Sequence, residues 1–87
     1  MDINDAVDAI DKCLKDYASA NADWSPTEIR VLPSSDDVDV IKVWLSFGDD
    51  VAEKDLPGLK QRAVAALGKA LPAVADSFEI KVRADVM

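Results

Sequence analysis

The chain has 87 residues, of which 49% are hydrophobic, and carries 17 acidic and 10 basic residues for a net charge of −7. A chain of this length buries roughly 60–65% of the surface of its unfolded form, which suits one domain with one sheet covered by helices on one side. The acidic balance opposes binding to nucleic acid and to anionic membranes, because affinity for a phosphate backbone comes from released counterions. We therefore expect a single compact domain over residues 1–87 without nucleic-acid or membrane partners.

The chain contains one cysteine and no histidine. A single cysteine excludes an internal disulfide, and the missing histidine removes the commonest general base and the commonest metal ligand. The N-terminal residues show neither the basic nor the apolar region of a signal peptide, and no apolar run approaches the ~18–20 residues that span a bilayer. The sequence therefore predicts an intracellular, cytoplasmic protein.

Residues 2–20 are expected to form an amphipathic helix, with Asp2 or Asn4 as its N-cap. Its apolar residues recur at spacings of three and four, which places them on one face: Ile3, Ala6, Val7, Ile10, Leu14 and Tyr17. A connector follows over residues 20–27. Trp24 lies in it, just before the first strand, and is expected to plug the end of the core.

Two strands are expected next, Glu28–Leu32 and Val38–Phe47, joined as a hairpin by the turn-forming residues 33–37. The second strand alternates between apolar residues on one side (Ile41, Val43, Leu45 and Phe47) and Lys42, Trp44 and Ser46 on the other. This period of two is typical of a strand with one face in the core. It places Trp44 on the face opposite the core, which makes Trp44 the most informative residue of the chain.

A second helix is expected over residues 55–71, with Asp55 as its N-cap and Pro57 in its first turn, where a missing N–H costs nothing. Pro72 is expected to stop this helix. The last element is a strand over Phe78–Val86, in which apolar and charged residues alternate along its length.

These elements predict an α+β fold, an open-faced two-layer sandwich in the order α-β-β-α-β, with a three-stranded sheet and both helices on one face. The connection through the second helix is long enough to make the second and third strands parallel neighbours. The preferred strand order is therefore 1-2-3, with Val38–Phe47 in the middle, and the alternative is an antiparallel 2-1-3 sheet.

The element order resembles the cytoplasmic dimerisation domain of cation-efflux transporters and is similar to the small modules of secretin rings. The resemblance lies in the order of elements and the strand patterning over most of the chain. The efflux domain binds metal through histidines, and because this chain has none, metal binding does not carry over.

The outer face of the predicted sheet offers candidate partner-binding residues. Mixed charges on a solvated sheet face are ordinary, but a tryptophan there forgoes the free energy of its burial. Trp and Arg are also enriched at the anchor points of protein interfaces. We therefore expect binding to a protein partner, or to a second copy in a homodimer, through Trp44, Lys42, Arg30, Leu32, Lys81 and Arg83.

No catalytic arrangement is evident, since there is no histidine for a Ser or Cys nucleophile, no Cys/His metal-ligand spacing and no Gly-rich phosphate loop. We expect no enzymatic activity, no cofactor and no small-molecule substrate. An alternative function is an acidic inhibitor, of the immunity or anti-defence type made by bacteria and phages, which occupies a basic site through the Asp-rich first helix and loops. RNA binding on the sheet is a third reading, which Trp44 favours and the net charge opposes.

Overall fold

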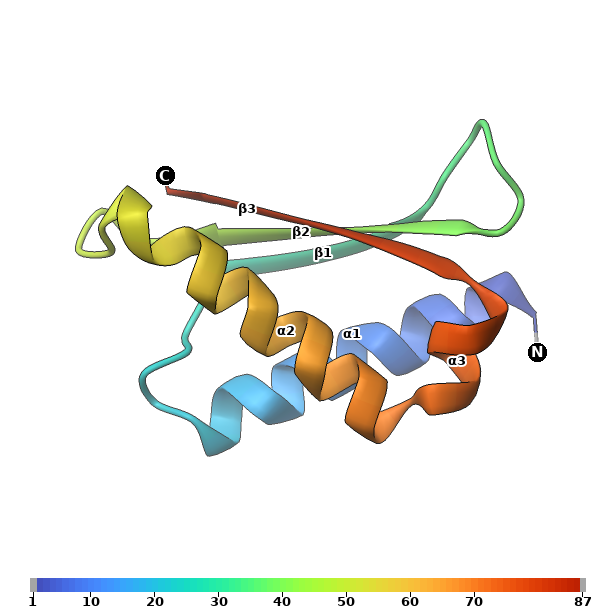
Figure 1. The fold of residues 1–87 in the computed structure, drawn as a ribbon, viewed down its shortest axis with the longest axis horizontal. Coiled ribbons are helices and arrows are strands. Elements are labelled where there is room, and N and C mark those ends of the chain that lie inside the picture. Colours follow the sequence, from blue (N-terminus) through green and yellow to red (C-terminus); the bar gives the residue numbers. More distant parts are fainter. Residues whose placement is uncertain (1, 87) are drawn as a thin grey trace.

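The helices and strands follow the predicted order, with one short helix added. The computed structural model of the chain describes residues 2–86. The elements are α1 Ile3–Ala20, β1 Glu28–Pro33, β2 Val40–Phe47, the 3-10 turn η1 Glu53–Asp55, α2 Leu56–Ala70, α3 Pro72–Ser77 and β3 Glu79–Val86. The strands form one layer and the helices lie together on one side of it (Figure 1), which confirms the predicted α+β fold.

Strand β2 lies in the middle of the sheet, between β1 and β3. It pairs antiparallel with β1 and parallel with β3. The parallel pairing is possible because α2 and α3 carry the chain back to the end of the sheet at which β2 began. The predicted order 1-2-3 is therefore confirmed, and the 2-1-3 alternative is wrong.

The inner face of β2 lies at the centre of the core. Ile41, Val43, Leu45 and Phe47 are each at most 1% exposed. Full burial of such a side chain contributes about 1.5–3 kcal/mol. The four apolar side chains therefore strongly favour the orientation of β2 in which they face the helices. The residues packed with them come from both long helices, α3, β3 and the connector after α1: Ala6, Ile10, Leu14, Trp24, Ala63, Leu67, Val74 and Val82.

Trp24 closes one end of this core and is fully buried, as predicted. Its ring meets Tyr17 edge-on at 5.0 Å between centroids and Phe47 at 6.0 Å. The indole Nε1–H donates a hydrogen bond of 2.8 Å to the carbonyl oxygen of Leu59 on α2. The indole therefore joins the connector to α2 through the hydrogen bond and to α1 and β2 through the ring contacts.

Arg62 of α2 covers this end of the core from outside. Its guanidinium donates to both carboxylate oxygens of Asp23, at 2.8 and 3.2 Å, and its Nε donates to the Tyr17 hydroxyl at 2.9 Å. The same group lies 5.5 Å from the centre of the Tyr17 ring. Because Asp23 precedes Trp24, the ion pair holds the connector next to α2 where Trp24 enters the core.

The ion pair predicts a change in acid stability. Hydrogen bonds from Arg62 hold the pKa of Asp23 below its ordinary value of 3.8. A carboxyl whose pKa is lower in the folded chain stabilises the fold above its unfolded pKa, and this contribution is lost as the pH falls through the folded pKa. Asp23→Asn should therefore lose less stability than the wild type in urea unfolding between about pH 4 and pH 2. Asp49→Asn, in the exposed loop after β2, should lose as much as the wild type, and equal slopes for all three chains would contradict the prediction.

The start of the second strand was predicted two residues too early, whereas the predicted stop of the second helix before Pro72 is confirmed. Val38 was expected in the second strand, but the strand begins at Val40 and Val38 is 83% exposed. The hairpin closes where the Ser34 N–H donates to the Val40 carbonyl at 2.9 Å, so Val38 lies in the turn beyond the last strand pair. Pro72 does follow the end of α2, but it also begins α3, because proline is well tolerated at the first position of a helix.

The predicted N-cap positions of the two long helices are confirmed, but without side-chain hydrogen bonds. Asp2 and Asp55 stand at the N-cap positions of α1 and α2, but neither side chain makes a capping hydrogen bond. Asp55 ends the 3-10 turn with helical backbone angles, φ −89° and ψ −13°, whereas a capping side chain needs an extended backbone to reach the helix N–H groups.

Candidate interaction surface

Trp44 projects from β2 on the side of the sheet that faces away from the helices. Its side chain is 43% exposed, whereas the flanking Val43 and Leu45 are at most 1% exposed. Successive residues of a strand point to opposite faces, and the described chain places no layer on this side of the sheet (Figure 1). The predicted orientation of Trp44 is therefore confirmed.

The strand register places an arginine on each side of Trp44. Arg30 of β1 and Arg83 of β3 both pair with Trp44 across the sheet. The Arg83 guanidinium carbon lies 4.6 Å from the centre of the indole ring, a cation–π contact worth about 0.5–1 kcal/mol at an exposed site. Each arginine also meets a carboxylate on its own strand: Arg30 Nε lies 3.4 Å from Glu28, and Arg83 Nε lies 3.2 Å from Asp85.

A second row continues the same surface toward the hairpin. Leu32, Lys42 and Lys81 are paired across the three strands, and Leu32 is 54% exposed. All six predicted residues thus lie together in two adjacent rows. We call them the Trp44 face: Arg30, Trp44, Arg83, Leu32, Lys42 and Lys81.

A third row, on the other side of Trp44, is acidic. It consists of Glu28, Ser46 and Asp85. The strand residues on this side of the sheet include four cations and the three carboxylates Glu28, Glu79 and Asp85. The rest of the chain contains six cations and fourteen carboxylates. The negative charge is therefore concentrated on the helices and loops.

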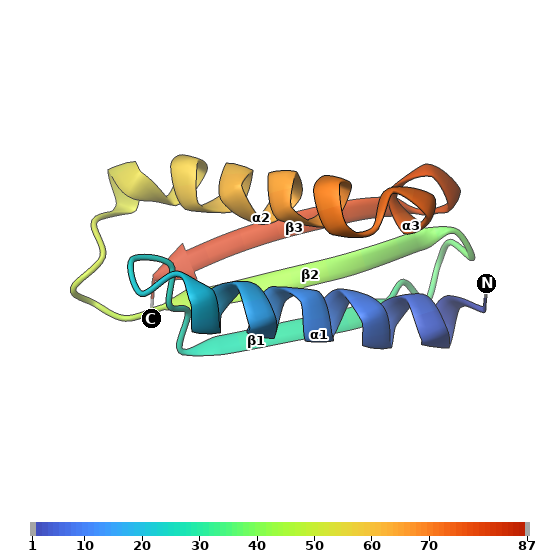
Figure 2. The ribbon, with the colours of Figure 1, turned by 90° about the horizontal axis from the view of Figure 1, so that it is seen from below.

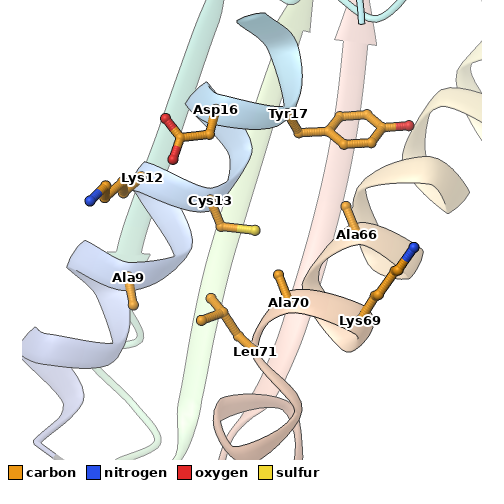
Figure 3. A pocket seen from close by; sticks show the side chains of 9 residues that line it. All are labelled: Ala9, Lys12, Cys13, Asp16, Tyr17, Ala66, Lys69, Ala70 and Leu71. Atoms are coloured by element: carbon orange, nitrogen blue, oxygen red, sulfur yellow. The ribbon is translucent and has the colours of Figure 1, made fainter. Parts of the chain in front are cut away.

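A separate hollow lies between α1 and α2, with a volume of about 730 Å³. Figure 3 shows Cys13 pointing from α1 toward Ala66 and Ala70 of α2, while Lys12 and Asp16 point away from α2. Burial, and secondarily the charge of Asp16, raises the pKa of the Cys13 thiol, which disfavours the nucleophilic thiolate. The sequence analysis missed this hollow, and the only signal for it was the row of small residues on the facing helix stripes.

The described residues 2–86 contain no group of three or more Cys, Asp or Glu side chains placed to hold a metal ion. Within the same range, none of the helices combines the length and the apolar character needed to cross a bilayer. Comparison with models of protein families, with curated proteins and with solved structures found no match. The resemblance in element order therefore gains no support from a family match, and the surface has to be interpreted from its own chemistry.

Proposed function

We propose that the chain is a small, acidic, non-catalytic protein–protein interaction module that associates, with itself or with a larger protein, through the Trp44 face. The observation that carries the proposal is the half-exposed indole between two arginines. A tryptophan side chain presents about 150–250 Å², and 43% of Trp44 is exposed. At about 25 cal/mol per Å², covering that remainder is worth about 2 kcal/mol, more than the cation–π contact with Arg83 supplies.

One face-to-face arrangement of two copies brings the two indoles together and pairs opposite charges at one position of this surface. Two copies can pack face to face about a two-fold axis that runs along the Arg30–Trp44–Arg83 row. The Glu28–Ser46–Asp85 row of each copy then lies against the Leu32–Lys42–Lys81 row of the other. Asp85 of each copy then faces Lys81 of the other and the two indoles meet at the centre, while Arg30 and Arg83 each face the same residue of the second copy. Two sheets packed in this way bury aligned inner faces, which supports self-association as one form of the proposed function.

The proposal is tested by sedimentation equilibrium on the wild type and on variants of the face. Trp44→Ala should weaken association by at least about tenfold, because truncating a central aromatic anchor commonly costs 2 kcal/mol or more. Lys42→Glu should weaken it as well. Val38→Ala is the matched control, since it removes an exposed apolar side chain from the turn between β1 and β2, and it should leave the association constant unchanged. Association that is indifferent to Trp44→Ala would contradict the proposal.

The charge distribution favours one alternative, an acidic inhibitor of the immunity or anti-defence type. Asp5 and Asp8 are exposed on α1, and Asp11 is 35% exposed and paired with Lys15 at 2.9 Å. Such a protein would bind a basic site on its target through these carboxylates. Under this alternative, reversing the charges of Asp5, Asp8 and Asp11 releases the target and added salt weakens binding steeply, whereas Trp44→Ala has little effect.

A further inference from the structure

Strand β3 has a free outer edge along its whole length. All eight of its residues, Glu79–Val86, pair with β2, and no other strand within residues 2–86 pairs with its far side. The Glu79 N–H donates to the Asp39 carbonyl at 2.8 Å, so Glu79 directs its backbone groups toward the β2 side. Because these directions alternate along a strand, Ile80, Val82 and Ala84 direct their N–H and C=O groups to the free edge.

The other edge of the sheet is less open. Strand β1 has six residues and ends at Pro33, which lacks an N–H and blunts an edge. Helix α1 lies over β1 (Figure 2). Strand β3 contains neither proline nor glycine between residues 79 and 86, so nothing in its sequence interrupts a further ladder of hydrogen bonds.

Helix α2 extends past this free edge. Figure 2 shows α2 over β3 and, toward the C-terminal end of β3, beyond it. Two hollows open between the helix and the edge, of about 210 Å³ and about 300 Å³, and Val82 lines both of them. The first also contains Val64, which is 46% exposed, and Gly68 of α2. The helical layer thus extends past the β3 edge, and the flank of α2 beside this edge carries the apolar Val64 together with the basic Lys60.

Edge-to-edge pairing of two β3 strands from two copies of the chain does not fit this place. Adjacent strands lie about 4.8 Å apart, whereas packed helices need about 8–10 Å between their axes. If two β3 strands paired edge to edge, the two α2 helices, each projecting past its own strand, would occupy the same space. A strand that carries no helix of its own has no such conflict.

We propose that the β3 edge binds an extended segment of another protein, which adds a fourth strand to the sheet beneath α2. Its backbone pairs with Ile80, Val82 and Ala84, and its inward side chains are apolar and cover Val64. Its outward side chains are acidic at the middle, because the middle outward neighbours on β3 are Lys81 and Arg83. This site differs from the Trp44 face in using the backbone edge of β3, although it shares the side chains of Lys81 and Arg83 with that face.

The test uses a labelled peptide of about nine residues, matched to the length of β3, in which valine alternates with threonine and glutamate occupies the two central polar positions. On binding, amide hydrogen exchange should slow by at least about tenfold at Ile80, Val82 and Ala84, and stay unchanged at Lys81 and Arg83, whose N–H groups already face β2. A peptide with lysine at the two central positions should bind at least about tenfold more weakly. Equal binding of both peptides, or no protection of the three amides, would overturn the proposal.

Two pairs of variants complete the test. Val64→Glu should weaken binding at least about tenfold, while Ala65→Glu, on an exposed position of α2 outside both hollows, should not. Ala84→Pro removes one edge N–H and should weaken binding, while Ala84→Ser keeps that N–H and should not. Leu32→Ala, which changes the Trp44 face on β1, the strand farthest from this edge, should bind the peptide normally and so separates the two sites. If the same amides are protected by dimerisation without peptide, or by a single-stranded oligonucleotide in place of the peptide, then an extended protein segment is the wrong occupant of this site.

Discussion

Replacing Trp24 with alanine is expected to lower the free energy of unfolding by about 3–5 kcal/mol, the usual cost of truncating a large buried aromatic side chain. Trp24 is fully buried, contacts the rings of Tyr17 and Phe47, and donates a hydrogen bond to Leu59. A domain of this size has a total stability of only about 5–13 kcal/mol. The variant should therefore be largely unfolded under mild denaturing conditions.

Urea unfolding followed by circular dichroism measures this loss, with two other variants for comparison. Trp24→Phe keeps much of the apolar volume but loses the indole N–H, so its stability should fall between those of the wild type and Trp24→Ala. Trp44→Ala is the matched control, because it removes the same side chain from the exposed face and should cost about 1 kcal/mol or less. If Trp44→Ala costs as much as Trp24→Ala, the assignment of the two indoles to surface and core is wrong.

A lysine at position 45 should unfold the domain, whereas a lysine one residue later should not. Leu45 is fully buried on the inner face of β2, and an unpaired charge there costs several kcal/mol. Ser46 lies on the outer face between Glu28 and Asp85. Ser46→Lys gains two cross-strand partners of opposite charge, each worth about 0.2–1 kcal/mol, so this variant should be at least as stable as the wild type.

Thermal unfolding of Leu45→Lys and Ser46→Lys tests this difference directly. Ser46→Gln is the uncharged control, and any stabilisation by lysine over glutamine should disappear at high salt, because exposed charge pairs are screened. A Leu45→Lys chain that stays folded, or a Ser46→Lys chain that unfolds, would mean that the faces of β2 are reversed.

Much of this fold could be predicted from residue spacing because each long element buries only one side. The alternation in Ile41–Phe47 and the spacing of Ile3, Ile10 and Leu14 each allow one arrangement that hides the apolar side chains. Because this spacing is a local property of the sequence, it was enough to predict the helices and strands. It also predicted that Trp44 points outward and that the basic residues of the three strands lie on one face. The parallel return of β3 followed from the length of the connection, which suits a crossover.

Other features depend on contacts between segments far apart in the chain, and no local pattern encodes them. The pairing of Asp23 with Arg62 across the connector, the hydrogen bond from Trp24 to Leu59 and the hollow beside Cys13 exist only because α1 and α2 lie next to each other on the sheet. The projection of α2 past β3 likewise reflects how two helices, each about 10 Å wide, fit over three strands spaced about 4.8 Å apart. Spacing along the chain settles which side of an element is buried, but the distances between elements arise from packing, and packing is a property of the whole domain.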